Sequence, residues 1–486
     1  MHMEQSVTRG FADFVRKTEF SRLPMEAVEQ AKDYILDCVG CTVAGYAVPE
    51  GVVVAGLAKE FGSGTATILP SGQKTSTAGA AFVNGKLANV IDADETLYNY
   101  FHVGGVPLHA ALSTAEEVGV GGRELIAATV LGYEFSFRFC HNYTLLAIGD
   151  DGRTTAARTA GFGFNTIAAA VAASRVLGLD IEGIRNAIGI AGYYVSLPLC
   201  NKWLYSKPWG MQKYQDFGWF CHAGTLAALF ARDGYTGDRF LLDDFGERSF
   251  WAAFGMPGFD FEGMIKDLGE QWGIMNAGIK PYPACRWYST PIHMLQQIMK
   301  ENELGADDIR SIRVTVPPVV VSAYGEPGHW PEWGFKDGTH SQYSVSYNLA
   351  CAALNIPVGP QWQMPDNLSR KEVVDFCRKI SFAVDDKCED KMTAYLKSGQ
   401  PKGKLMTQVH YTLEVESSKG TFGDAAEYIY GDTYDREHAL SREELIRKFK
   451  GNCSSVLSPN IVEKVVEAVY HLEECGRISD FTRLFS

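Results

Sequence analysis

The apolar residues in the first part of the chain recur with the spacing of amphipathic helices. In residues 21–45 they stand three or four positions apart, Pro24 suits the first turn of a helix, and Gly45 ends the pattern. Residues 107–135 predict one helix on each side of a GVGG break. Residues 161–179 predict a helix rich in alanine and glycine, which allow neighbouring helices to approach closely. The pattern therefore predicts a domain of packed helices.

The pattern changes after residue 275. Half-buried strands are predicted where apolar and polar residues alternate, at 311–316, 379–384 and 408–415. Helical patterns separate these segments, around 287–300, 342–354 and 370–378. From Ser441 the chain is helical again, and Ser441 with Glu444 predicts a capping box.

These elements predict a mainly α protein with an α+β second domain. We expect a large all-helical domain from residues 1–275, completed by residues 437–486, and a smaller α+β lid domain from residues 276–436. A chain of 486 residues is longer than one hydrophobic core usually holds, which also favours two domains.

Composition narrows the possible partners. The net charge is −13 with both signs interspersed, a surface that repels nucleic-acid phosphates. The least polar segment, residues 161–179, is interrupted by polar residues and predicts a buried helix rather than a membrane span. The 11 cysteines are scattered and odd in number, and no basic stretch followed by an apolar one opens the chain. We therefore expect reduced thiols in a cytoplasmic protein, without nucleic-acid or membrane partners.

The stretch IDADETLYNYFHVGGVPLH, residues 91–109, contains several acidic residues and two histidines close together in the sequence. Asp92, Asp94 and Glu95 precede His102 and His109, and carboxylates with imidazoles can ligate a divalent metal. The same residues can transfer protons, or they can cap the end of a helix. The two histidines lack the one-turn spacing of common metal motifs. Spacing alone leaves all three interpretations open.

Three other segments carry candidate residues. Lys213 lies among aromatic residues in 207–224, where a lysine can bind an anion or extend to water. Lys280 precedes PYP in a stiff segment, 278–290, which is either part of a pocket or a plain linker. Residues 341–354 place two tyrosines one helical turn apart, and such tyrosines often belong to a core. GxSxG, Walker A and HExxH motifs are absent from the sequence.

Taken in order, these segments resemble the MmgE/PrpD family. The family's D-x-D-D-T segment is similar to DADET at 92–96, and its histidine-glycine-proline segment is similar to HVGGVPLHAAL at 102–112. Its lysine-glycine-tryptophan segment is similar to QKYQDFGWFCHAG, and its K-P-Y-P-x-C-R is present as KPYPACR, 280–286. The family's helix with a serine and a tyrosine is similar to SVSYNLACAAL in this chain. The similarity extends over nearly the whole chain.

The resemblance implies a helical domain and an α+β lid with an active site between them, a homodimer, and catalysis without an organic cofactor and, in most members, without a metal. By position, it implies a site made of Asp92, Thr96, His102, Lys213, Lys280 and Tyr347. Asp94 and Cys285 fall within the matching motifs, as further substrate-binding residues.

Departures from the family pattern predict a different substrate. Thr159 and Asp216 stand where relatives have histidines, so the pocket is less cationic than one built for a tricarboxylate. Aromatic residues add surface nearby, at Tyr98, Tyr100, Phe101, Trp203, Tyr205, Trp209 and Tyr214. We expect both substituted residues to contact substrate, and the substrate to be bulkier or less charged than citrate-like acids.

These expectations define a cofactor-independent lyase or isomerase that acts at the carbon alpha to a carboxylate or carbonyl, most like a 2-methylcitrate dehydratase. His102 is the expected acid/base and Asp92 its partner, while Lys213 and Lys280 bind the substrate carboxylate. Tyr347 protonates or positions the substrate. The alternatives are an epimerase or decarboxylase of the same family, a metal-dependent hydrolase, and a catalytically silent carboxylate-binding protein.

Overall fold

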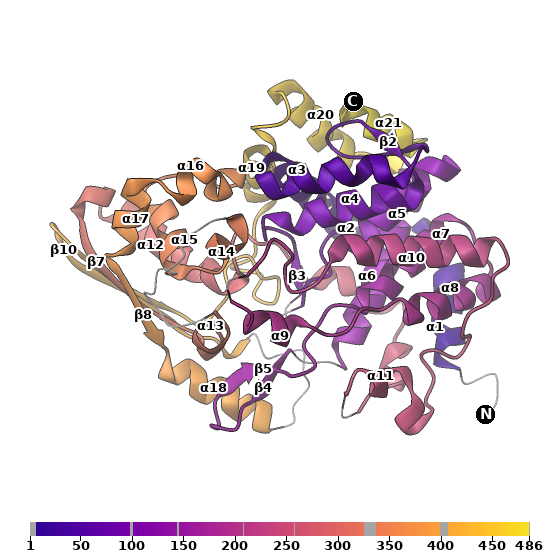
Figure 1. Ribbon diagram of the computed structural model, residues 1–486, viewed down its shortest axis with the longest axis horizontal. Coiled ribbons are helices and arrows are strands. Elements are labelled where there is room, and N and C mark those ends of the chain that lie inside the picture. The colour runs from indigo at the N-terminus through magenta and orange to yellow at the C-terminus, as the bar shows by residue number, and fades with distance from the viewer. Residues whose placement is uncertain are drawn as a thin grey trace.

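The computed structural model describes residues 6–97, 101–142, 145–207, 209–256, 258–324, 337–398 and 407–485. Figure 1 shows helices gathered on one side of the molecule and a sheet with its own helices on the other. The fold is mainly α with an α+β part, as the pattern predicts.

The helical part is built around α7 (Asn165–Val176), whose twelve residues are all buried. It contacts α5 (Val106–Val118), α6 (Gly122–Cys140), α8 (Ile181–Tyr193) and α10 (Phe217–Arg232). Glycine allows the closest of these approaches, because a Cβ at Gly224 of α10 would lie 2.4 Å from the carbonyl oxygen of Thr166. The small residues of this segment therefore act as the sequence predicts, and they bring backbones together rather than fill space.

Helices from both ends of the chain pack together. The long helix α2 (Met25–Ala47) contacts α4 (Thr77–Val90) and also α19 (Arg442–Cys453) and α20 (Pro459–Tyr470). The predicted capping box is confirmed, since the Ser441 hydroxyl accepts from the Glu444 amide while the Glu444 side chain accepts from the Ser441 amide. In Figure 1 the C-terminal helices lie beside α3 (Pro49–Gly56) and α4.

The other part holds a four-stranded sheet in the order β10-β9-β7-β8. The strands are β7 (Ile309–Val316), β8 (Ile380–Val384), β9 (Tyr411–Ser417) and β10 (Gly420–Ala426). β7 pairs parallel with β8, and the other pairs are antiparallel. The three predicted strands are confirmed. β10 was not predicted, because its sequence GTFGDAA is mostly exposed at the sheet edge and carries almost no apolar alternation.

Helices cover this sheet and connect it to the rest of the molecule. α12 (Ser289–Glu301) packs on β9 and β10 and contacts α15 (Val345–Ala353), which in turn contacts α17 (Lys371–Cys377). Another helix of this part, α18 (Asp386–Lys397), contacts the hairpin of β4 (Leu146–Ile148) and β5 (Thr154–Ala156), which extends from the helical part.

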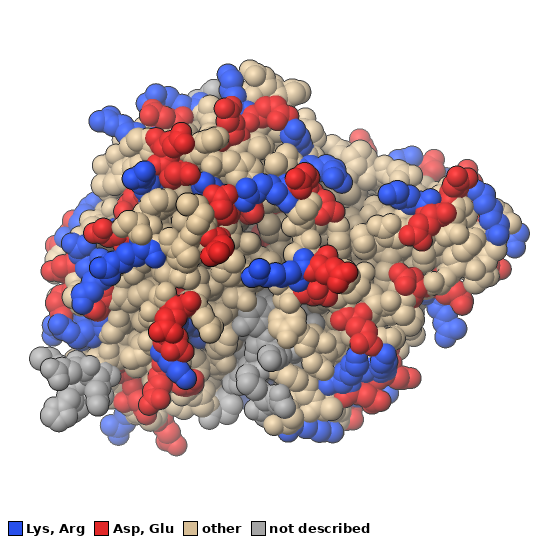
Figure 2. All heavy atoms as spheres, turned by 180° about the vertical axis from the view of Figure 1, so that it is seen from behind, with Lys and Arg blue, Asp and Glu red and all other residues tan. Residues whose placement is uncertain are grey.

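Within the described segments no single helix is long and apolar enough to cross a membrane; by length and composition only the pair Met25–Ala47 and Pro49–Phe61, bent by 96°, could do so. Acidic and basic side chains are interspersed over the face shown in Figure 2, as the composition predicts.

Candidate active site

The centre of the site is a sharp turn at Asp92, directly after α4. Asp92 has a left-handed backbone with φ of 57°, a conformation that aspartate tolerates better than most residues. Its amide donates to the carbonyl oxygen of Asn89 at 3.2 Å. The turn places the Asp92 carboxylate inside the molecule, where it is only 2% exposed.

Two buried lysines bind this carboxylate. Lys213 Nζ lies 2.6 Å from Asp92 Oδ1, and Lys280 Nζ lies 2.9 Å from Oδ2 and 2.6 Å from the Asp92 carbonyl oxygen. The Tyr343 hydroxyl donates to Oδ1 at 3.2 Å. Burial alone raises the pKa of Asp92, but Lys213, Lys280 and His102 outweigh it and lower that pKa below its ordinary value. The carboxylate is therefore ionised, as the anion of a buried charged cluster.

His102 lies beside this cluster, with Nδ1 3.2 Å from the carbonyl oxygen of Glu95 and 3.5 Å from Asp94 Oδ2. A carbonyl oxygen only accepts, so Nδ1 carries the proton and Nε2 is the unprotonated nitrogen. Burial, helped by the charge of Lys280, lowers the pKa of His102 despite Asp94. The imidazole is therefore neutral near pH 7 and suited to accept a proton at Nε2.

Glu95 supports the loop that carries His102. Its carboxyl oxygens accept from the amides of Val103 at 3.2 Å and Gly104 at 2.8 Å, and from the Tyr133 hydroxyl. Burial raises the pKa of Glu95 to about 8 against the opposing effect of these donors. The sequence offered Glu95 as a metal ligand, a proton-transfer group or a helix cap; its contacts instead make it a residue that positions the His102 loop.

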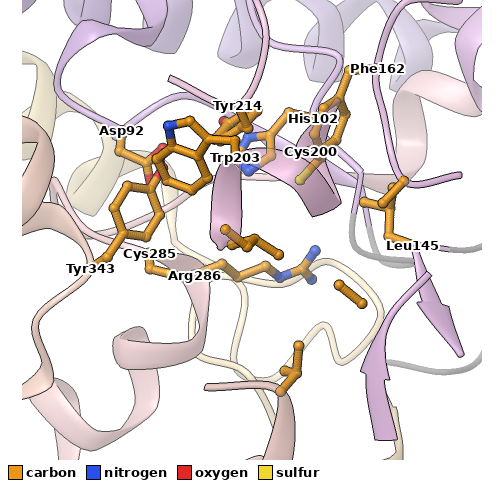
Figure 3. A pocket seen from close by; sticks show the side chains of 14 residues that line it. Asp92, His102, Leu145, Phe162, Cys200, Trp203, Tyr214, Cys285, Arg286 and Tyr343 are labelled. Atoms are coloured by element: carbon orange, nitrogen blue, oxygen red, sulfur yellow. The ribbon is translucent and has the colours of Figure 1, made fainter. Parts of the chain in front are cut away.

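A pocket opens beside Asp92 and His102, between segments of both parts of the fold (Figure 3). Its other walls are Leu145, Ala156, Ala160, Phe162, Cys200, Trp203, Leu204, Tyr214, Cys285, Arg286, Val319 and Tyr343. The cavity volume is about 30 Å³, room for about two water molecules and far below the roughly 300 Å³ at which ligand sites begin. A substrate therefore needs more room than this arrangement of the wall residues provides.

Neither lysine of the cluster lines this pocket, although both were expected to bind the substrate carboxylate. Both ammonium groups point instead at Asp92. Among the described residues, Arg286 is the one lysine or arginine on the pocket wall. Its Nη1 donates to the carbonyl oxygen of Leu97 at 2.5 Å and its Nη2 forms an ion pair with Asp432. Arg286 belongs to the segment 278–290, for which the sequence left open a pocket or a plain linker, and the structure places this residue on the pocket wall.

Tyr347 was expected in the site, but the structure places it in the core. Its hydroxyl donates to the carbonyl oxygen of Trp362 at 2.6 Å, and it is fully buried. Tyr343, four residues earlier, lines the pocket and contacts Asp92. The two tyrosines were expected one turn apart on one helix, but Tyr347 lies in α15 whereas Tyr343 ends α14 (Gly338–Gln342). The break between these helices lets the two side chains face different surroundings.

The structure brings some of the expected substrate-binding residues to the pocket and leaves others outside. Cys285 lines it, and Asp94 lies next to His102. Asp216 caps α10 by accepting from the Trp219 amide and pairs with Lys86 at 2.6 Å, outside the pocket wall.

Two threonines also lie outside the pocket wall. Thr96 is buried in β3 (Thr96–Leu97), which pairs antiparallel with β6 (Ala277–Gly278) and joins the His102 region to the Lys280 segment. Thr159 is half-buried and lies close to Gly255.

The four proposed metal ligands do not form one group among the described residues. His109 is buried in α5, with Nε2 2.9 Å from the Thr42 hydroxyl. Across the described ranges, no three histidine, cysteine, aspartate or glutamate side chains form a group that could hold a metal ion. The geometry thus gives no support to a site that uses His109 with Asp92, Asp94 and His102.

Some of the aromatic residues expected near the site line the pocket, and others do not. Trp203 and Tyr214 line the pocket, and Trp209 stacks on Trp203 with ring centroids 4.7 Å apart. Phe101 is buried near Phe162, whereas Tyr205 is exposed. Tyr98 and Tyr100 lie outside the described residues.

Comparison with known families finds two matching domains in the chain. The MmgE/PrpD N-terminal domain matches residues 9–262, and the MmgE/PrpD C-terminal domain matches residues 282–473. The chain belongs to the MmgE/PrpD family. The resemblance drawn from the motifs is thereby confirmed.

Curated relatives of this MmgE/PrpD protein include cis-aconitate decarboxylases. The chain is 23% identical to that of Aspergillus terreus, over 99% of this chain and 95% of the relative. It is 25% identical to the Mus musculus protein, over 99% and 94%, and 23% identical to the Homo sapiens protein, over 99% and 95%. Both family domains are thus present in a chain that matches these relatives nearly end to end.

Proposed function

We propose that this protein is a lyase that removes a proton from the carbon alpha to a carboxylate or carbonyl group of its substrate. The proposal rests on the position and protonation of His102. Its neutral imidazole lines the pocket, and its Nδ1 is hydrogen-bonded to the Glu95 carbonyl oxygen. A base of this kind is fixed in its tautomer and orientation before the substrate arrives.

In this reaction His102 Nε2 takes the α-proton, and the electron pair of the C–H bond is delocalised into the neighbouring carboxylate or carbonyl oxygen. When hydroxide leaves the next carbon, the pair forms a carbon–carbon double bond, and the imidazolium returns its proton to the hydroxide as water. Proton transfer of this type contributes roughly 10²–10⁴-fold to a rate.

The charged cluster supports this chemistry from behind the pocket. Lys213 and Lys280 keep Asp92 ionised, and Asp92 itself lines the pocket near His102. A buried anion on the same pocket wall favours the imidazolium that forms when the base takes a proton, while the two ammonium groups favour the negative charge on the substrate. The charges of this cluster are already in place before the reaction, so they can stabilise both the imidazolium and the substrate anion without rearranging.

Decarboxylation is the second candidate, because the curated relatives are named cis-aconitate decarboxylases. Here the bond to a carboxylate breaks, carbon dioxide leaves, and its electron pair remains on the α-carbon until a proton from protonated His102 replaces it. The two reactions use the same residue in opposite protonation states, so they predict opposite dependence on pH.

The proposal is tested by incubating the protein in D₂O with a panel of carboxylic acids and following both deuterium uptake and carbon dioxide release. Deuterium at the α-carbon without carbon dioxide supports proton abstraction, and carbon dioxide release supports the second candidate. If no deuterium uptake, no carbon dioxide and no unsaturated product is seen with any acid that binds, the protein is a carboxylate-binding protein and the proposed lyase function is wrong.

A further inference from the structure

We propose that Arg286 binds the carboxylate of the substrate, and that this substrate carries one carboxylate joined to an apolar group. This inference rests on the proposed function, because it names the substrate class of the same pocket. It is carried by the charge balance of the site, by the position of Arg286, and by the apolar nature of the remaining wall.

The charges around the pocket are already balanced. Lys213 and Lys280 bind Asp92, and Asp94 lies beside the neutral His102. The third cation, Arg286, pairs with Asp432. Three cations thus stand beside three carboxylates, and a tricarboxylate would bring three further anionic groups without matching cations. Burying an unpaired carboxylate is strongly unfavourable, so the pocket disfavours such a substrate.

Arg286 is placed to bind one carboxylate. It is 2% exposed, and Figure 3 shows its guanidinium extending along the pocket on the opposite side from His102 and Trp203. A planar guanidinium with five N–H donors matches a carboxylate in two parallel hydrogen bonds. A carboxylate held there lies across the cavity from His102, so the adjacent carbon can face the base.

Asp432 is the group that a substrate carboxylate would replace. It lies in the segment after β10 and also lines a neighbouring cavity of about 220 Å³, so its side chain has room to turn away from Arg286. The exchange of one carboxylate for another leaves the guanidinium paired throughout, which avoids the cost of a buried, uncompensated charge.

The rest of the wall favours an apolar group. It consists of Leu145, Ala156, Phe162, Trp203, Leu204 and Val319 among others. Trp203 is fixed between Trp209, which stacks on it, and Tyr343, whose ring lies edge-on with centroids 5.2 Å apart. A rigid aromatic face of this kind favours a flat or apolar group over a second carboxylate.

The test compares binding of phenylacetate, a monocarboxylate, with binding of tricarballylate, a tricarboxylate, by isothermal titration calorimetry. We expect phenylacetate to bind the wild-type protein at least about 10-fold more tightly. Arg286→Gln should weaken phenylacetate binding by about 10- to 100-fold, and Arg286→Lys should restore part of it. Arg185→Gln is the matched control, since Arg185 is also buried and held by a carboxylate and a carbonyl oxygen, but outside the pocket.

A merely structural role of the Arg286–Asp432 pair makes the opposite prediction for a second variant. Asp432→Asn keeps the acceptor for the Tyr434 amide but removes the charge that competes for Arg286. We expect this variant to bind phenylacetate more tightly than the wild type, whereas a structural pair would give weaker binding. This measurement also decides the question if Arg286→Gln fails to fold.

Tighter binding of tricarballylate, or unchanged phenylacetate binding in Arg286→Gln, would overturn the substrate class. Deuterium uptake or carbon dioxide release from a polycarboxylate in the same preparation would leave the proposed lyase function intact. The failures of the two proposals can therefore be told apart.

Discussion

Replacement of Asp92 by asparagine should destabilise the protein far more than loss of an ordinary ion pair. The side chains of Lys213 and Lys280 are 5% and 1% exposed, and both ammonium groups depend on the same carboxylate. Asparagine has the same shape and also tolerates the left-handed backbone at this position, so charge is the main property that changes. The substitution leaves two buried cations without their anion.

The magnitude follows from burial. Removing one partner of a buried ion pair costs about 3–5 kcal/mol in the free energy of unfolding. Because Asp92→Asn leaves two buried lysines without their carboxylate, we expect a cost at the upper end of this range, about 5 kcal/mol. Asp37→Asn removes the carboxylate from one buried lysine, Lys448, and should lower the free energy of unfolding by about 3 kcal/mol. Asp216→Asn is the partly exposed control. The Lys86 and Asp216 side chains are 21% and 27% exposed and asparagine keeps the capping role, so the cost should be about 0–1 kcal/mol.

The loss should also depend on pH with a definite sign. Burial lowers the pKa of Lys213 even with Asp92 present, and removal of the carboxylate lowers it further. Between that lowered value and the ordinary 10.5, the folded state binds fewer protons than the unfolded state, so its stability rises with pH. The deficit of Asp92→Asn relative to the wild type should therefore shrink as the pH is raised from neutral toward 10.5.

Urea unfolding followed by circular dichroism, at several pH values, measures these differences from the midpoint at unchanged slope. Equal costs for Asp92→Asn and Asp216→Asn, or a deficit that grows with pH, would refute the argument that buried charge holds this cluster together.

Three further predictions concern catalysis. His102→Gln should lower the turnover of any substrate found by about 10²–10⁴-fold with an unchanged circular dichroism spectrum, and retained turnover would rule out His102 as the base. Because burial lowers the pKa of His102, the acidic limb of a kcat/KM profile for proton abstraction should lie below pH 6.5, and a limb above that value would contradict a neutral base. Tyr343→Phe should lower kcat/KM because its hydroxyl contacts Asp92 in the pocket, while Tyr347→Phe should leave kcat/KM unchanged and cost about 1 kcal/mol of stability. Equal kinetic losses in the two tyrosine variants would contradict their placement.

Local patterns were enough to predict much of the architecture. Helical periodicity and end signals predict α2, α7 and α19, because a helix satisfies its backbone hydrogen bonds within a few residues and records its buried face in the sequence. Alternation predicts three of the four strands of the sheet. It fails for β10, an edge strand with one exposed face and few apolar residues, because pairing with β9 rather than its own sequence makes it a strand.

Motif order likewise predicted that Asp92, His102, Lys213 and Lys280 would belong to one site. The structure brings them together, but the direction of each side chain depends on segments far apart in the chain. Both lysines turn toward Asp92, because a buried carboxylate is strongly unfavourable unless cations compensate its charge.

The sequence by itself thus determined the helices, most of the sheet, and the residues with the chemistry for proton transfer. Tertiary structure decided that Arg286 rather than a lysine faces the pocket, and that Tyr343 rather than Tyr347 lines it. The physical reason is that periodicity records which side of an element is buried, whereas a site forms where the buried sides of several elements leave a gap, and that gap exists only after they have packed.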